Sequence, residues 1–148
     1  MLSFKQFLEN DEEYASSHRP AGIEEGAPLH DLTFNGVYPK DVYDRYWEYA
    51  YDAMDKECMY IALNYRGKPD KKVWIYRAVP KSVRMINPGD WVTLSRNYAL
   101  QHAREFPGVV LSARVTANNT DGSLSEWGYN GLSPIKGFVS YRSRIKKP

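Results

Sequence analysis

Residues 73–95 read VWIYRAVPKSVRMINPGDWVTLS, and this stretch decides the fold. Its first part alternates with the period of a β-strand, so Val73, Ile75, Arg77 and Val79 share one face. An arginine therefore sits in an otherwise apolar row. Because a guanidinium is rarely buried without a partner, we expect Arg77 to meet either an internal carboxylate or a bound anion such as a pyrophosphate.

A second short strand follows the turn NPGD at residues 87–90. It places Trp91, Thr93 and Ser95 on one side and the apolar side chains between them on the other. If the two strands are neighbours, two hydroxyls and an indole lie near Arg77. The sequence thus predicts a small polar site with an aromatic wall, set into a hydrophobic sheet.

Composition limits the class of protein. The chain has 148 residues, about one domain, which can build a core without disulfides or metal. A formal charge of +2 is too small for a protein that binds along nucleic-acid phosphates. The basic tail indicates a solvated end of the chain, with a nucleic-acid-binding patch as the alternative. The single cysteine suits a reducing compartment. No apolar run approaches the roughly 20 residues that span a bilayer, so we expect a soluble protein with no membrane partner.

The order of elements predicts the fold class. The expected elements are a helix at 3–17, a loop at 18–28, one long or two short helices from Pro39 to Tyr65, the strands above, a helix at about 97–105, a strand at 109–117, a turn at 118–122 and a last strand at 137–141. The segment SEWGYNG, from Ser125, is too rich in glycine and polar groups for a plain strand. Helices first and short strands later predict an α+β domain, not a parallel βαβ fold.

Glu126 is the candidate catalytic group. It lies between aromatic and hydroxyl side chains just after a turn, and Trp91, Trp127 and Tyr129 are candidates for the wall of its cleft. A carboxylate near an arginine and hydroxyls suits cleavage of a glycosidic bond, where positive charge develops on the sugar ring. The alternative is that Glu126 forms a structural ion pair with Arg77.

Other chemistry has weaker signals in the sequence. The three histidines have no metal-ligand spacing, so we expect no metal site, and no glycine-rich phosphate loop occurs. Cys58 lies on the apolar stripe of its predicted helix, which favours a buried, inert thiol. Tyr98 and His102 share a helix face that either borders the cleft or packs on the domain.

These residues resemble a known family. In this order, Arg77 in IYRAV, the strand WVTLS with the following RNYALQHA, and Glu126 in SEWGY resemble the arginine, serine and glutamate motifs of ADP-ribosyltransferases. The phrases HRP, GAPLHDLTFNGVYPKDVY, VPKSVRMINPGDWVTLSRNYA and EWGYNG are similar to ADP-ribosyltransferase-like domains of phage proteins, including phage head morphogenesis proteins. The resemblance covers residues 18–148 and implies a split, strongly bent β-sheet core with helices in front.

The resemblance also implies roles. Arg77 would hold the phosphates or ribose of NAD, Thr93 or Ser95 would orient the nicotinamide ribose and Glu126, and Glu126 would stabilise the transition state. Members that modify arginine carry a second glutamate two residues before the catalytic one, where this chain has Leu124. The implied activity is transfer of ADP-ribose from NAD to a macromolecular acceptor, a host protein or nucleic acid.

The first residues, MLSFKQFLE, look like the head-targeting peptides of large tailed phages, but the sequence favours an ordinary amphipathic helix within residues 1–17. A targeting peptide implies a protein packaged in the phage head and acting in the host cytoplasm. Two further hypotheses stand beside the transferase. One is a catalytically silent domain of the same shape with a structural or host-binding role, and the other is hydrolysis of NAD alone.

Overall fold

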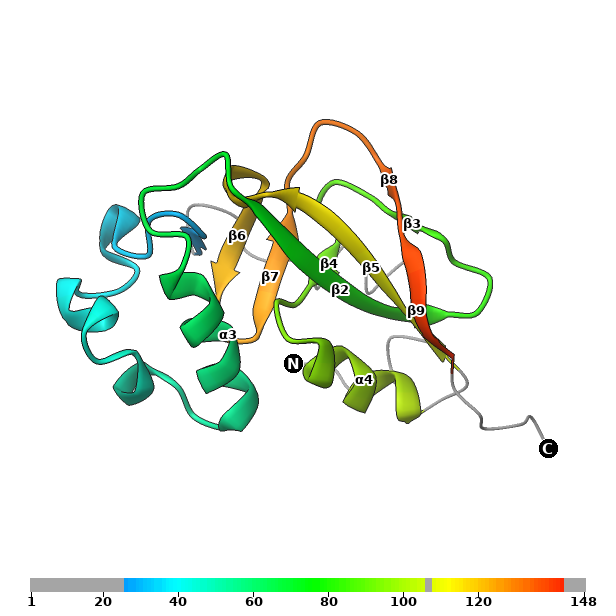
Figure 1. Ribbon diagram of the computed structural model, residues 1–148, viewed down its shortest axis with the longest axis horizontal. Helices are drawn as coiled ribbons and strands as arrows, with labels where there is room; N and C mark the ends of the chain where they lie inside the picture. The colour runs from blue at the N-terminus through cyan, green and yellow to red at the C-terminus, as the bar shows by residue number, and fades with distance from the viewer. Residues whose placement is uncertain (1–25, 106–107, 143–148) are drawn as a thin grey trace.

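A long antiparallel pair of strands crosses the middle of the computed structural model (Figure 1). These strands are β2 (Lys72–Pro80) and β5 (Gly108–Thr116), and β9 (Phe138–Arg142) extends the sheet beyond β5. The register between β5 and β9 shifts between Val110 and Leu111. The three strands predicted at 73–79, 109–117 and 137–141 are therefore confirmed, each to within a few residues.

The structure describes residues 26–105 and 108–142. The predicted helix at 3–17, the domain boundary after residue 17 and residues 18–25 of the predicted loop at 18–28 lie outside these ranges. The described end of that loop is not all loop, because Ala27–Pro28 forms the short strand β1.

A second, four-stranded sheet carries the segment that contains Glu126. Its strands are antiparallel in the order β1 (Ala27–Pro28), β6 (Thr120–Ser123), β7 (Glu126–Tyr129) and β4 (Trp91–Val92). One bridge between Tyr76 and Thr93 joins it to β2. The expectation that SEWGYNG holds no plain strand is wrong, because pairing with β6 on one side and β4 on the other compensates for the poor strand propensity of Gly128.

Smaller elements complete the fold. A two-stranded sheet joins β3 (Met85–Ile86) to β8 (Ile135–Lys136) at the end of the molecule away from α3 (Figure 1). The helices are α3 (Ala53–Leu63), α4 (Arg96–Arg104) and the 3-10 segments η2 (Phe34–Gly36), η3 (Lys40–Tyr43), η4 (Tyr46–Tyr49) and η5 (Ala117–Asn119). No helix in the described part of the chain is both long and apolar enough to cross a bilayer. The architecture is mixed α+β with antiparallel sheets, as predicted.

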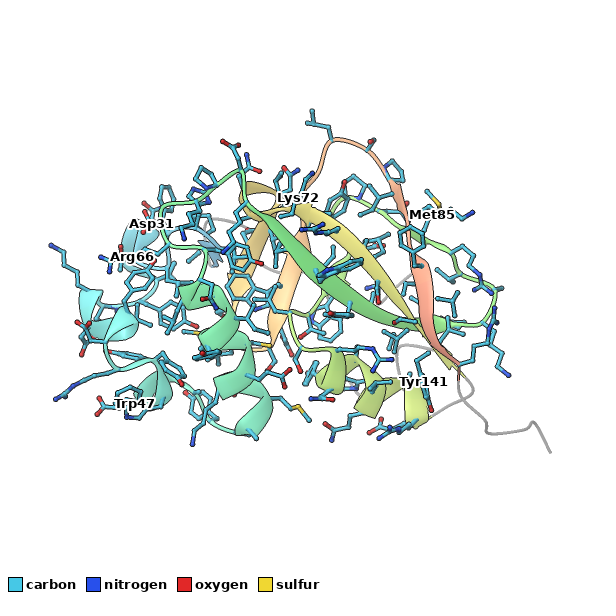
Figure 2. The ribbon with its side chains drawn as sticks, viewed as in Figure 1. Asp31, Trp47, Arg66, Lys72, Met85 and Tyr141 are labelled. Carbon is cyan, nitrogen blue, oxygen red and sulfur yellow. The ribbon has the colours of Figure 1, made fainter. Side chains whose placement is uncertain are left out.

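Of the helical options between residues 39 and 65, the structure has one α-helix preceded by two 3-10 turns. Arg45 interrupts the helical backbone with a φ of −136°. Asp52 then starts α3 by accepting a hydrogen bond from the backbone N–H of Asp55 at 2.8 Å. The aromatic side chains of the 3-10 segments partly face outward, and Figure 2 shows Trp47, 51% exposed, at the outer edge of this region.

The two faces of β2 pack into different cores. Val73, Ile75 and Val79 belong to the main core, which they share with α3 and the four-stranded sheet. Ala78 faces the opposite way and packs with Trp91 and with residues of α4 in a smaller cluster. Because β2 alternates between these two clusters, each of its side chains is committed to one side of the sheet. Arg77 lies in the main-core row and is only 7% exposed.

Candidate active site

A two-residue turn positions Glu126 at the start of β7. Ser123 pairs with Glu126 across β6 and β7, so Leu124 and Ser125 form the turn. Leu124 has a φ of +54°, a left-handed conformation that is unusual for a branched side chain but suits a tight hairpin. Its N–H donates to the Tyr38 hydroxyl at 3.2 Å, and its carbonyl accepts from the Trp127 indole at 2.9 Å. These contacts fix the turn, and the turn fixes Glu126.

The turn opens on an acidic cavity of about 320 Å³. The residues that line it are Asp52, Asp55, Tyr98, Ser123, Leu124, Ser125 and Glu126. Asp55 accepts a hydrogen bond from the Ser125 hydroxyl at 2.5 Å, which ties α3 to the turn. None of these described lining residues is a lysine or arginine. A cavity with carboxylates and the ring of Tyr98 suits a ligand group that carries or develops positive charge.

Glu126 sits in a partly desolvated position. Burial raises its pKa above the ordinary value for a glutamate, and the negative charge of Asp55 acts in the same direction. A contact with the Trp91 side chain favours the charged form and opposes this shift. A carboxylate that is poorly solvated by water interacts strongly with a positive charge brought close to it.

Arg77 finds its partner inside the protein. Its Nε lies 3.7 Å from the Asp90 carboxylate, and its Nη1 donates to the Trp91 carbonyl at 2.5 Å. Asp90 also accepts a hydrogen bond from the N–H of Asn87 at 2.8 Å. Of the two expected partners the structure thus has the internal carboxylate, supplied by the turn at 87–90 and not by Glu126. Arg77 is absent from the residues that line the Glu126 cavity.

The two candidate hydroxyls are fully buried, and neither is among the residues that line the cavity. Thr93 Oγ1 accepts from the N–H of Ser95 at 3.2 Å and lies 3.6 Å from the sulfur of Cys58. Ser95 caps α4 by accepting from the N–H of Tyr98 at 3.1 Å. Ser95 therefore acts on the cavity indirectly, by starting the helix that carries Tyr98. Cys58 is 0% exposed, and burial raises its pKa to about 11, so its thiol is inert as predicted.

The three aromatic side chains that are candidates for the cavity wall lie on two different faces of the four-stranded sheet. Trp127 and Tyr129 belong to the main core, on the opposite side of β7 from Glu126 and Gly128. Trp91 stands opposite Gly128 on β4 and so shares the face of Glu126. Of the predicted site residues, Glu126 and Trp91 are therefore brought together, and Trp127 and Tyr129 do not line the cavity.

Comparisons of this chain with protein-family models, with curated proteins and with solved structures find no match. In residues 26–105 and 108–142, no three histidine, cysteine or acidic side chains are grouped so that they could hold a metal ion.

Sequence reasoning missed the contributions of Asp52 and Asp55. Asp52 has a local signal, because an aspartate directly before an amphipathic helix is a preferred N-cap. Asp55 has none, since its partner Ser125 lies 70 residues away. Tyr98 was placed on a helix face that either borders the cleft or packs on the domain, and it lines the cavity. Its neighbour His102 lies 4.5 Å behind it, ring to ring, where burial lowers the pKa of the imidazole to about 4.

Proposed function

We propose that this protein is an NAD-dependent ADP-ribosyltransferase in which Glu126 is the catalytic carboxylate. The observation that carries the proposal is the fixed, half-buried position of Glu126 in an acidic cavity with an aromatic wall. The order of the motifs in the sequence, with Arg77 first, then Thr93 or Ser95, and then Glu126, supports it independently. The acceptor in this proposal is a macromolecule of the host, either a protein or a nucleic acid.

The chemistry follows from where charge develops. When the bond between C1′ of the ribose and the nicotinamide nitrogen breaks, its electron pair leaves with the nicotinamide, which becomes neutral. The sugar ring gains oxocarbenium character, and the Glu126 carboxylate stabilises that positive charge. The acceptor then forms a bond to C1′ and loses a proton. The Tyr98 ring offers a face on which the cationic nicotinamide can stack before cleavage.

The proposal extends to the fold. An ADP-ribosyltransferase-like core requires a split, bent sheet. The supporting observation is that the three-stranded and four-stranded sheets are separate and that, within the described residues, the isolated bridge between Tyr76 and Thr93 joins them. It also includes a phage-encoded effector that is packaged in the head and acts in the host cytoplasm, which rests on the sequence resemblance alone.

A catalytically silent domain with a structural or host-binding role in a phage is the second candidate. The specific observation in its favour is that Arg77, the residue assigned to the phosphates of NAD, is buried against Asp90 and the Trp91 carbonyl. A phosphate clamp must be open to its ligand, whereas a scaffold gains order from an internal ion pair.

Label transfer separates these candidates. The protein is incubated with bacterial lysate and NAD labelled in the adenylate half, and the macromolecular fraction is then counted. A transferase moves label to an acceptor, and Glu126→Gln abolishes the transfer. Release of nicotinamide without transferred label indicates hydrolysis of NAD alone. The silent domain produces neither product.

A further inference from the structure

The three-stranded sheet of β2, β5 and β9 has an outer face, opposite the main core, that is only partly covered. Cross-strand pairing puts Trp74 beside Arg114 on this face, and it puts Tyr76 in line with Ser112 and Phe138. Trp74 is 45% exposed and Phe138 is 68% exposed, so two large rings of the outer face meet solvent. From the spacing of residues and strands, their Cα atoms lie about 12 Å apart.

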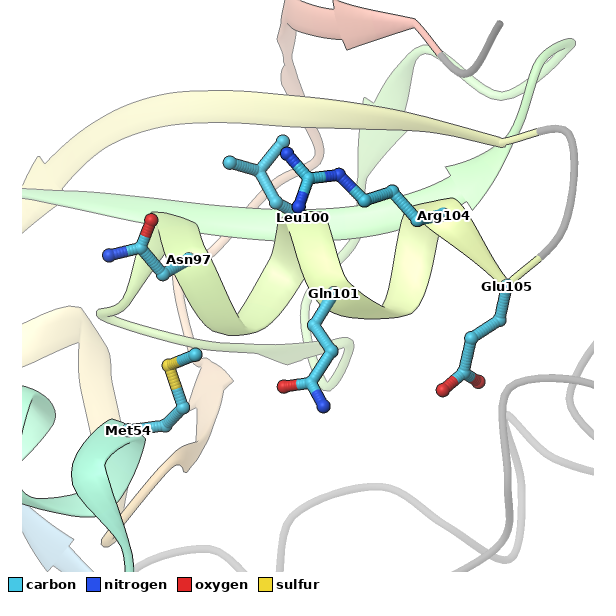
Figure 3. Close-up of a pocket in the computed structure, with 6 residues that line it drawn as sticks. All are labelled: Met54, Asn97, Leu100, Gln101, Arg104 and Glu105. Atoms are coloured by element: carbon cyan, nitrogen blue, oxygen red, sulfur yellow. The ribbon is translucent and has the colours of Figure 1, made fainter. Parts of the chain in front are cut away.

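Helix α4 covers the other end of the outer face. Ala78 of β2 and Val110 of β5 are buried there in one apolar cluster with Leu100 of α4. Figure 3 shows Leu100 and Arg104 directed from α4 toward the strands, whereas Gln101 points away from them. The helix therefore closes the face near Ala78 and leaves its opposite end open.

Cations surround the exposed rings. The Arg114 guanidinium lies over the Trp74 ring, 6.0 Å from its centre. Arg96, the first residue of α4, donates from Nη2 to the Ser140 carbonyl on β9 at 2.8 Å, which brings its guanidinium to the sheet. Lys72 begins β2 and is exposed. The strands β2, β5 and β9 contain no aspartate or glutamate.

The charge of the whole chain does not describe this face. The formal charge is only +2, but acidic side chains gather around the Glu126 cavity and cations gather on the outer face. At the border, burial raises the pKa of Tyr76, Arg96 opposes that shift and Glu57 of α3 adds to it. A local positive field beside exposed rings is thus compatible with a nearly neutral total.

We propose that the outer face binds single-stranded nucleic acid. Two bases stack on Trp74 and Phe138, because every base offers a π-face to an aromatic ring. The phosphates of the strand are held by the cations around the rings, which are Lys72, Arg96 and Arg114. This inference goes beyond the proposed transferase and does not depend on its chemistry.

A single strand suits these features better than a duplex or a protein does. The bases of a duplex are already stacked on one another, so rings that stand on an open sheet cannot reach their faces. The centre of a protein interface is depleted of charged side chains, whereas here Arg114 lies over Trp74. The hydroxyl of Ser112 donates to that of Ser140, which donates to the Val110 carbonyl, so the strand is held through its bases and phosphates.

The test is fluorescence anisotropy of a labelled strand of about ten thymidine deoxynucleotides, titrated with the full chain at several salt concentrations. Trp74→Ala and Phe138→Ala should each weaken binding about tenfold, since one base loses its stacking partner. Trp47→Ala is the matched control, because Trp47 is 51% exposed but lies on η4. It should leave the affinity unchanged.

Arg114→Gln tests the contact with phosphate. It should weaken binding and lower the slope of log affinity against log salt by about 0.7 for one lost phosphate contact. Arg45→Gln is its control, because the Arg45 side chain is 61% exposed and precedes η4. Urea midpoints establish that each variant is folded, and Phe138→Ala alters the more exposed of the two rings.

Four results would overturn the inference. They are no binding of the strand by wild type at about 50 mM salt, wild-type affinity in both Trp74→Ala and Phe138→Ala, a duplex bound as tightly as the single strand, and polyglutamate competing as well as unlabelled strand. The last result would assign the face to an acidic protein. Binding that depends on both rings and on salt supports the inference, whether or not the protein releases nicotinamide from NAD.

Discussion

Replacing Arg77 by methionine tests whether this arginine is part of the fold or is held for a ligand. Methionine fills a similar volume without charge, so the substitution removes the cation and keeps the apolar contacts. It leaves the Asp90 carboxylate buried without its ion-pair partner and removes the hydrogen bond to the Trp91 carbonyl.

The magnitude follows from burial. Arg77 and Asp90 are each 7% exposed, so solvent cannot replace the lost partner. Breaking a buried ion pair from one side costs about 3–5 kcal/mol of the free energy of unfolding. The double variant Arg77→Met, Asp90→Asn should recover at least half of that loss. An asparagine at position 90 is neutral, and its side-chain oxygen can still accept from the N–H of Asn87.

Urea unfolding followed by tryptophan fluorescence measures the four proteins of this double-mutant cycle. The account predicts a strong loss in each single variant and partial recovery in the double. A loss below about 1 kcal/mol for Arg77→Met would refute the reasoning. Arg77 would then contribute little to the fold and would be available for a bound anion.

Three further predictions concern single side chains. Ser95→Ala should cost about 1 kcal/mol of unfolding free energy through loss of the α4 cap, which urea midpoints measure, and an unchanged midpoint contradicts this. Cys58 should not react with a thiol reagent at pH 8 in the folded protein, because burial raises its pKa to about 11. It should react once guanidinium unfolds the protein, and reaction without denaturant contradicts the prediction. Burial raises the pKa of Asp121 from 3.8 to about 6, so between these pH values the folded protein keeps a proton that the unfolded chain releases. The free energy of unfolding therefore falls as the pH rises from about 4 to about 6. Asp121→Asn should therefore stabilise the protein by up to about 3 kcal/mol at pH 7.5 and hardly at all at pH 3.5, which urea midpoints at the two pH values would show; equal effects at both contradict it.

The sequence predicts the central strand and the burial of Arg77, because alternation along β2 is a local property. It does not predict that Asp90 is the partner. That choice depends on how β4 pairs with β7, and the resulting position of the turn at 87–90 is a property of the assembled sheet. The sequence predicts an internal carboxylate as one possible partner and names Glu126 for it, whereas the structure has Asp90.

The candidate site, like the strand, is predictable from the sequence only in part. Glu126 is recognisable because a carboxylate among aromatics directly after a turn is conspicuous, but the faces of its neighbours depend on whether the segment is a strand. Gly128 weakens the strand signal of β7, and without that strand the alternation that sends Trp127 and Tyr129 into the core cannot be applied. The aromatic segments before α3 were misleading for another reason, since their helical spacing extends over 3-10 turns too short to be an α-helix.

Nicotinamide release from NAD by wild type and Glu126→Gln, measured beside calorimetric NAD affinity, tests the central claim most directly. The carboxylate stabilises charge that appears only as the glycosidic bond breaks, so the rate should fall on the order of a hundredfold while affinity changes little. Asp52→Asn is the control, because it removes a neighbouring charge of the same cavity and preserves an N-cap residue. Full activity of Glu126→Gln would contradict the assignment of Glu126, and a wild type that neither binds NAD nor releases nicotinamide with any lysate would contradict the transferase itself.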